Sequence, residues 1–467
     1  MAMEPKPTTL GALRKSEYQV LPVKAEMRKN LIDKMRRGEQ YFPGILGYED
    51  TILPQIENAI LSGQDIVLLG ERGQAKTRLA RSLINLLDAE TPMIAGTELN
   101  DNPYHPESAL GRQMVAEMGD ETPIEWLPRD RRYGEKLATP DTTIADLIGE
   151  VDPIKIAEGR YLSDELTIHY GMVPRTNRGI FCINELPDLA ERIQVGLLNI
   201  MEERDVQIRG YKVRLDLDMF MVASANPEDY TNRGRIITPL KDRFGSEIRT
   251  HYPKTIEHEM DIMEREHLTF PNDGVALDTP QFMKEIIAEL THLARKSPQI
   301  SQKSGVSVRV SIANYENLVA NALRRAIRLG ETQAVPRVSD LHAVVASTAG
   351  KIELESMGEL DEQRVVERLV QQAVSTTFER YYRLSELEGV IRSFEKGTFL
   401  EASDTMPARD YGRHAQTLAG METAIAKLKV PNDPAHIASA VEFILEGLHL
   451  NRRLNKNQDG QRFRYRA

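Results

Sequence analysis

The chain has 467 residues, of which 41% are hydrophobic and 28% are charged, and its net charge is −10. This composition is ordinary for a globular protein, and the charge gives no overall attraction to nucleic acid. No apolar run approaches the ~18 residues of a membrane span, and the first residues lack the apolar core of a secretory signal. Cys182 is the single cysteine, which excludes an internal disulfide and fits a reducing compartment. We therefore expect a cytoplasmic protein of several domains.

The chain starts with a predicted helical lead-in, residues 1–40, whose helix is AEMRKNLIDKMRRGE. A glycine loop, GERGQAKT (70–77), follows further on. The mostly apolar run DIVLLG (65–70) before it predicts a buried strand, and TRLARSLINLLD after it predicts an amphipathic helix. Because a strand, a glycine loop and a helix N-terminus in this order hold phosphates through backbone N–H groups, we expect ATP to bind here.

Each position of this loop has an expected role. Lys76 would reach the β- and γ-phosphates, and the Thr77 hydroxyl would bind Mg²⁺. Ala75 stands where the pattern G-x-x-x-x-G-K-[ST] has its second glycine, and alanine is tolerable there if its backbone angles are ordinary, since only a positive φ strictly needs glycine. The expected ATP-binding residues are Gly70, Glu71, Arg72, Gly73, Gln74, Ala75, Lys76 and Thr77.

A second predicted strand, IFCI (180–183), ends in Asn184 and Glu185, where P-loop ATPases usually carry Asp-Glu. Glu185 is expected to polarise the attacking water, as a catalytic acid of this kind does. Asn184 keeps an oxygen for the Mg²⁺ site but lacks the negative charge. Cys182 is expected to be a core residue of this strand.

A third predicted strand, MFMVASAN (219–226), places Asn226 where ligands bind at the carboxyl end of an α/β sheet. Asn226 is therefore expected to hydrogen-bond the attacking water or the γ-phosphate. Arg243 in KDRFG follows a predicted helix. Such an arginine is more often a salt-bridge partner, but here it could serve a neighbouring subunit as an arginine finger.

In chain order, the segments GERGQAKT, IFCINE, ASANP, PLKDRFG and GVSVRVSIANYENLVANA resemble those of AAA+ ATPases, in the branch that holds MoxR proteins and the ATPase subunit of magnesium chelatase. The resemblance covers roughly residues 41–350. It implies an α/β P-loop core with a parallel sheet between helices, a helical lid, and ATP and Mg²⁺ as cofactors. Alanine before the lysine recurs in MoxR-type loops, whereas Asn184 departs from the family pattern.

The resemblance also implies roles for segments outside these strands. PGILGYED (43–50) would lie near the adenine, and Arg309 would be the sensor 2 arginine on the lid. Residues 144–179 would form the helix 2 insertion of this branch, and residues 202–218 its pre-sensor hairpin.

We expect the remaining organisation to follow from helical spacing and charge. The nucleotide-binding domain would span 41–255, and the helical lid 256–355. A C-terminal helical domain would span 356–450. The basic segment 451–467 is predicted to be a disordered tail, in preference to a nucleic-acid arm.

The expected function is a Mg²⁺-dependent ring ATPase, a hexamer, that remodels or assembles a partner protein. By the resemblance, that partner could carry a von Willebrand A domain. One alternative is the ATPase subunit of a magnesium or other metal chelatase, which rests on the family alone. An alternative of another class is a scaffold that binds ATP without hydrolysing it, which Asn184 suggests and the retained Glu185 opposes.

Overall fold

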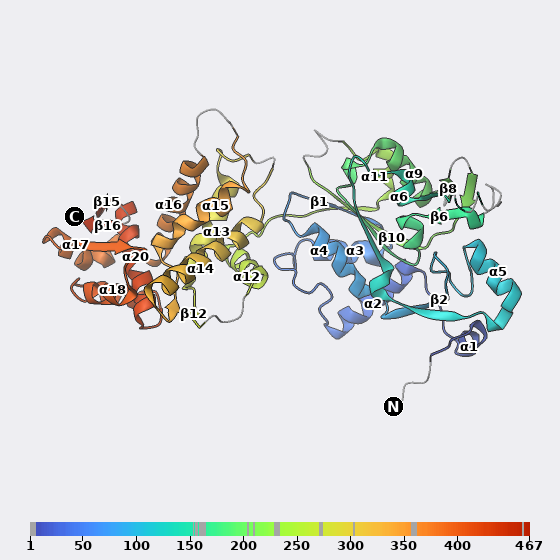
Figure 1. Ribbon diagram of the computed structural model, residues 1–467, viewed down its shortest axis with the longest axis horizontal. Coiled ribbons are helices and arrows are strands. Elements are labelled where there is room, and N and C mark those ends of the chain that lie inside the picture. The colour runs from blue at the N-terminus through green and yellow to red at the C-terminus, as the bar shows by residue number, and fades with distance from the viewer. Residues whose placement is uncertain are drawn as a thin grey trace. The chain divides into compact units, whose positions relative to one another are not determined.

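The chain folds as two compact units, Met1–His251 and Tyr252–Ala467 (Figure 1). The computed structural model describes residues 6–152, 154, 157, 165–202, 205–208, 211–227, 234–269, 274–301, 304–355, 362–459 and 462–467. The division after His251 falls close to the end of the nucleotide-binding domain expected from the sequence.

A five-stranded parallel sheet forms the centre of the first unit, with the strand order β11-β1-β10-β7-β4. Its strands are β1 (Ile66–Leu69), β4 (Tyr133–Leu137), β7 (Gly179–Asn184), β10 (Met219–Ala225) and β11 (Ser246–Arg249). The three strands predicted from apolar runs are β1, β7 and β10, the inner strands of the sheet, and they are almost entirely buried. Parallel strands covered on both faces need such continuous apolar runs.

Helices cover both faces of this sheet. The helices of the first unit are α1 (Leu10–Lys15), α2 (Val23–Arg37), α3 (Leu53–Leu61), α4 (Lys76–Ser82), α5 (Ala109–Met118), α6 (Ile144–Leu147), α8 (Met172–Arg175), α9 (Glu191–Glu202) and α11 (Thr238–Arg243). Side chains of α2, α3 and α4 pack on one face against Ile66, Leu68 and Cys182. Those of α6, α9 and α11 pack on the other face against Val67 and Ile183. The α/β P-loop core expected from the sequence is confirmed.

Two expectations about helices are corrected. The predicted helical lead-in is part of this core, because Val23, Met27 and Leu31 of α2 are fully buried in it. The helix predicted after the glycine loop is α-helical only to Ser82 and continues as a 3-10 helix over Leu83–Leu86.

The described part of the first unit also contains three small antiparallel pairs. They are β2 (Glu90–Ile94) with β3 (Ile124–Pro128), β5 (Gly149–Val151) with β6 (Ile168–Tyr170), and β8 (Asp205–Ile208) with β9 (Tyr211–Arg214). The pair β8–β9 is the hairpin expected within 202–218. Parts of that hairpin and of the 144–179 insertion lie outside the described residues, namely 203–204, 209–210, 153, 155–156 and 158–164.

The second unit is mainly helical. Its elements are α12 (Ile256–Glu266), β12 (Ala276–Leu277), α13 (Gln281–Lys296), α14 (Arg309–Leu329), β13 (Gln333–Ala334), α15 (Val344–Ala349), α16 (Glu362–Tyr381), α17 (Glu388–Glu395), β14 (Leu400–Ser403), α18 (Ala408–Ala415), α19 (Met421–Lys427), α20 (Pro434–Leu450), β15 (Asn455–Asp459) and β16 (Arg462–Arg466). The rings of Phe282 and Phe443 stack with centroids 4.5 Å apart, and Phe378 packs edge-on against Phe443. These contacts join α13, α16 and α20 in one hydrophobic core. The expected lid and C-terminal domain therefore share a core instead of folding as two separate domains.

The prediction of a disordered tail is wrong. Strands β15 and β16 form a hairpin, and β16 pairs with β14 in an antiparallel sheet. Tyr465 of β16 is 2% exposed, and its hydroxyl donates a hydrogen bond to Glu446 on α20. The basic residues Arg462, Arg464 and Arg466 alternate with Phe463 and Tyr465, so the charges face outward while the aromatic side chains pack inward. The net charge of the segment, on which the prediction rested, does not report this alternation of basic and aromatic residues.

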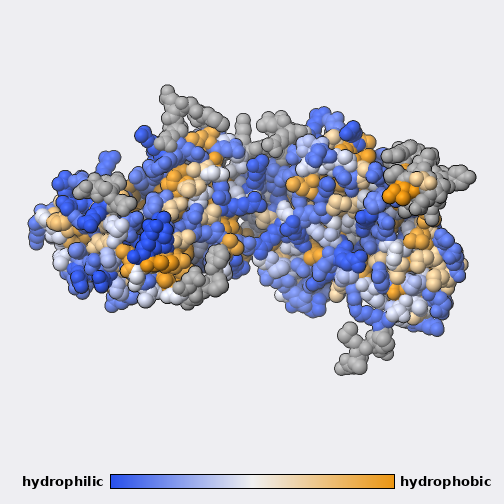
Figure 2. Space-filling model, viewed as in Figure 1, coloured by the Kyte–Doolittle hydropathy of each residue, from blue (hydrophilic) through white to orange (hydrophobic). Residues whose placement is uncertain are grey.

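Hydrophilic residues cover much of the visible face of each unit, with hydrophobic residues between them (Figure 2). Among the described residues, no helix combines the length and the apolar character needed to cross a membrane.

Candidate nucleotide-binding site

The predicted site residues of the first unit meet at the carboxyl ends of β1, β10 and β7. In the sheet register Leu69 lies beside Ala225, and Ala223 lies beside Ile183. The residues that follow these strands therefore emerge at the same edge of the sheet, where ligands bind in open α/β folds.

The glycine loop is held tightly against its neighbours. A Cβ atom at Gly70 would lie 2.3 Å from Gln74 Oε1 and 1.9 Å from Thr250 Oγ1, so this position needs glycine. Gln74 braces the loop, since its Oε1 accepts hydrogen bonds from the backbone N–H of Glu71 (3.0 Å) and from the Thr250 hydroxyl (2.7 Å). Gly73 has a φ of 75°, which glycine adopts without cost. These contacts explain the glycines of the motif.

Ala75 does not have ordinary backbone angles, the condition under which alanine would fit here without strain. Its φ is 55° and its ψ is 17°, in the left-handed region. An L-residue other than glycine is strained there by roughly 1–2 kcal/mol. Glu185 has a similar φ of 56°. Two non-glycine residues of the candidate site are thus strained, and such strain is concentrated at functional sites.

Asn226 links the loop lysine to the predicted catalytic glutamate. The Lys76 ammonium donates to Asn226 Oδ1 (2.6 Å), to the carbonyl of Glu71 (3.0 Å) and to the carbonyl of Gly70. Asn226 Nδ2 in turn donates to Glu185 Oε2 (2.6 Å). Lys76 is 7% exposed and Asn226 is 7% exposed. The structure therefore brings together three residues that are distant in sequence, as predicted.

Asn184 makes a different set of contacts. Its Nδ2 donates to Glu135 Oε1 (2.8 Å), and its Oδ1 accepts from the Ser224 hydroxyl (3.1 Å). Glu135 also forms a two-pronged ion pair with Arg81 of α4, at 2.7 and 2.9 Å. Glu135 was not predicted, because β4 (YGEKL) has no apolar run that would identify it as a strand.

The donor set at this edge suits Mg²⁺. The hydroxyl of Thr77 and the oxygens of Asn184, Glu185 and Glu135 are hard ligands, and Mg²⁺ is usually held by few protein groups together with phosphates and waters. Among the described residues, no group of three or more His, Cys, Asp or Glu side chains is arranged to hold a metal ion.

Cys182 is a core residue, as predicted. It lies within β7, and burial raises the pKa of its thiol to about 12. The thiol is therefore protonated at neutral pH, whereas the thiolate is the reactive and metal-binding form.

The segment 43–50 contacts the loop. The Tyr48 hydroxyl lies within hydrogen-bond distance of the carbonyls of Gln74 (2.9 Å) and His251 (2.7 Å). Burial raises the pKa of Tyr48, so its hydroxyl keeps its proton. A Cβ atom at Gly44 would lie 2.3 Å from a guanidinium nitrogen of Arg78 on α4. The segment thus packs against both the loop and the helix that follows it.

Arg243 and Arg309 both lie on helices, one in each unit. Arg243, in the last turn of α11, forms an ion pair with Glu202 of α9, and its side chain is 42% exposed. Arg309 is the first residue of α14 and is exposed in the second unit. The roles predicted for these two arginines remain predictions.

Comparisons with known proteins find similarities of low sequence identity. No family model matches the sequence. A stretch of 161 residues, 31% of this chain, is 27% identical to the uncharacterized protein YeaC of Bacillus subtilis (strain 168) and spans 49% of that relative. A chain of the complex between subunits BchI and BchD of magnesium chelatase is 20% identical, with 72% of this chain and 95% of that chain covered and a TM-score of 0.36. NtrX from Brucella abortus is 15% identical, with coverages of 78% and 69% and a TM-score of 0.39.

The fold class of the first unit follows from its own strand order. A parallel sheet in the order β11-β1-β10-β7-β4, with the predicted phosphate-binding loop directly after β1, is an α/β P-loop fold.

The strain at Ala75 gives a stability prediction. Ala75→Gly should raise the free energy of unfolding of the first unit by about 1 kcal/mol, because glycine is unstrained at a φ of 55°. Ala80→Gly, within α4, is the matched control and should lower it by about 1 kcal/mol or more. Denaturant unfolding followed by fluorescence of Trp126, the single tryptophan, reports on this unit. A loss of stability in both variants would contradict the left-handed backbone at Ala75.

Proposed function

We propose that this protein is a Mg²⁺-dependent ATPase of the AAA+ class that works as a homo-oligomeric ring, a hexamer, and remodels a partner protein. The observation that carries the proposal is the position of Asn226 between Lys76 (2.6 Å) and Glu185 (2.6 Å). A lysine for phosphate, an amide and a water-activating carboxylate at one sheet edge are the groups that ATP hydrolysis requires.

The loop residues account for nucleotide binding. The backbone N–H groups of 70–77 and the N-terminus of α4 would surround the phosphates. Lys76 uses two backbone carbonyls and Asn226 as hydrogen-bond acceptors, and phosphate oxygens would replace these neutral acceptors with charged ones. Thr77 would hold Mg²⁺, with Asn184 at the edge of the metal site, and the bound ion would neutralise charge on the phosphates.

Glu185 and Asn226 account for hydrolysis. The Glu185 carboxylate would take a proton from the attacking water, and the Asn226 amide would orient that water. The backbone N–H of Glu185 donates to the Ser224 hydroxyl (3.2 Å), which anchors the strained turn that carries the carboxylate. The contact between Asn226 and Glu185 places the amide within reach of the same water.

Arg243 would complete the site of a neighbouring subunit. Its ion pair with Glu202 lies at the surface, and exposed pairs of this kind contribute only about 0–1 kcal/mol. A phosphate of a neighbouring site can therefore compete for the guanidinium at small cost. Arg309, at the start of α14, would contact the nucleotide as the sensor 2 arginine. Tyr48 would lie near the adenine.

The finer assignment rests on the motif resemblance. Within the AAA+ class, we place the protein in the branch of MoxR proteins and the magnesium chelatase ATPase subunit, with a partner that carries a von Willebrand A domain. Asn184 in place of aspartate separates it from the usual pattern of that branch.

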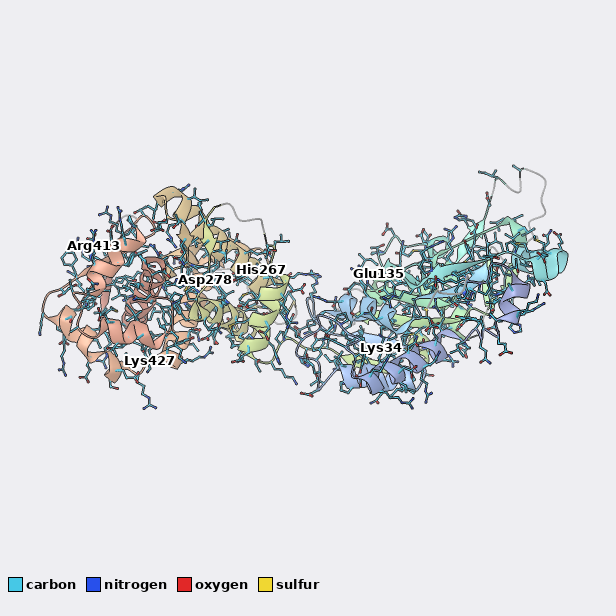
Figure 3. The ribbon with its side chains drawn as sticks, turned by 90° about the horizontal axis from the view of Figure 1, so that it is seen from below. Lys34, Glu135, His267, Asp278, Arg413 and Lys427 are labelled. Carbon is cyan, nitrogen blue, oxygen red and sulfur yellow. The ribbon has the colours of Figure 1, made fainter. Side chains whose placement is uncertain are left out.

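Loss of the loop lysine tests nucleotide binding. Lys76→Ala should weaken ATP binding by on the order of 100-fold in a calorimetric titration, because it removes the charged donor to the phosphates. Lys34→Ala is the matched control, since Lys34 is a lysine of α2 that pairs with Glu39 (Figure 3). It should bind ATP as the unaltered protein does. Equal affinity in all three proteins, with intact circular dichroism, would contradict the assignment of the loop.

A mixing experiment tests the ring. Arg243→Ala and Glu185→Gln should each lower turnover, by up to about 10³–10⁵-fold for the arginine, while ATP still binds. A mixed ring contains interfaces where an intact Glu185 meets an intact Arg243, so activity should reappear on mixing.

The control for the mixing experiment is Lys241→Ala, which removes another exposed cation of α11 and should keep turnover. Mixed assemblies that form but stay inactive would contradict a finger supplied from a neighbouring subunit. Absence of turnover in the unaltered protein that binds ATP would favour the scaffold function instead.

A further inference from the structure

We propose that Glu135 supplies the negative charge that the magnesium site would otherwise lack at Asn184. The inference rests on the proposed function, because it concerns the same nucleotide site. In this arrangement the acid of the metal site has moved from the end of β7 to the neighbouring strand β4. Glu135 acts as a positioning residue that places charge and accepts hydrogen bonds at the metal's water shell.

The orientation of the Asn184 amide follows from its hydrogen bonds. The Ser224 hydroxyl accepts the backbone N–H of Glu185 (3.2 Å), so its own hydrogen is directed to Asn184 Oδ1 (3.1 Å). The Cys182 thiol also lies 3.7 Å from that oxygen. The amide oxygen is thus engaged within the sheet, and the amide nitrogen is directed toward Glu135.

The contact with Glu135 explains why position 184 is an amide. Asn184 Nδ2 lies 2.8 Å from Glu135 Oε1 and donates a hydrogen to it. An ionised aspartate at position 184 has no hydrogen to donate, and two carboxylates at this separation repel each other. Asn184 and Glu135 are therefore complementary and carry a single negative charge between them.

Glu135 lies where it can contact a metal's water shell. It belongs to β4, the edge strand beside β7 (Figure 3). Its side chain is 20% exposed. Its partner Arg81 follows Thr77 by one turn of α4, so both side chains lie on the same side of that helix. The Glu135 carboxylate is thus paired with the side of α4 that also carries the predicted metal ligand Thr77.

Arg81 does not prevent this role. Its side chain is 65% exposed, and exposed ion pairs contribute little net stability. Divalent charge close to the carboxylate outweighs a single solvated guanidinium. Arg81 therefore orients Glu135 in the absence of metal and gives way when the metal is bound.

The test moves the negative charge between positions 135 and 184 and measures nucleotide binding. Calorimetry would measure the affinity of the full-length protein for ADP in EDTA and in MgCl₂. The ratio of the affinity in MgCl₂ to that in EDTA is the gain in ADP affinity due to the metal. Glu135→Gln should reduce this gain by on the order of 10–100-fold, as loss of an outer-shell partner does. Affinity in EDTA should stay unchanged.

Two further variants distinguish the effect of the Glu135 negative charge from the effect of its side-chain shape and contacts. The double variant Glu135→Gln/Asn184→Asp returns the charge to β7 and should restore the gain. Arg81→Gln breaks the same ion pair as Glu135→Gln but keeps the carboxylate, so it should leave the gain unchanged or larger.

Each outcome decides the inference. The inference would be overturned if Glu135→Gln left the gain in ADP affinity unchanged. It would also be overturned if Arg81→Gln reduced that gain as much as Glu135→Gln does. Failure of the double variant to restore the gain would also overturn it, because Glu135 would then act through shape alone. If the unaltered protein does not bind ADP in either buffer, the proposed function fails and this inference fails with it.

Discussion

The candidate site depends on one side-chain amide at the centre of the sheet. Asn226 follows β10, which lies between β1 and β7, and its two ends contact Lys76 and Glu185. An amide suits this position because its oxygen accepts from the ammonium while its nitrogen donates to the carboxylate. An aspartate would remove the amide hydrogen that Asn226 donates to Glu185, and a lysine would remove the oxygen that accepts from Lys76. The phosphate-binding and water-activating parts of the site are coupled through this residue.

Backbone strain is present on both sides of that amide. Ala75 and Glu185 adopt positive φ values of 55° and 56°, and each is held by rigid surroundings. The loop before Ala75 is braced by Gln74, and the turn at Glu185 is anchored on Ser224. A parallel sheet buried on both faces can sustain such local cost, because its strands hold the loop ends in fixed positions. Both strained residues lie at the carboxyl end of the sheet, Ala75 in the loop after β1 and Glu185 directly after β7.

Much of the fold and part of the site could be predicted from the sequence. Strands β1, β7 and β10 are continuous apolar runs, and the polar residues after them had to meet because parallel strands end at one edge. Glu135 could not be predicted, since an edge strand such as YGEKL needs no apolar run. The left-handed backbone at Ala75 could not be predicted, because residue type alone does not report φ. The hairpin of the basic tail was missed because a count of charges ignores the alternation around Tyr465.

The most direct measurement is a structure of the Glu185→Gln protein with ATP and Mg²⁺. The account predicts that the Lys76 ammonium leaves the carbonyls of Gly70 and Glu71 for the β- and γ-phosphates, with Asn226 beside the γ-phosphate and Thr77 on the metal. A nucleotide bound away from residues 70–77 would contradict the account. So would a bound nucleotide with Lys76 still held by the two carbonyls.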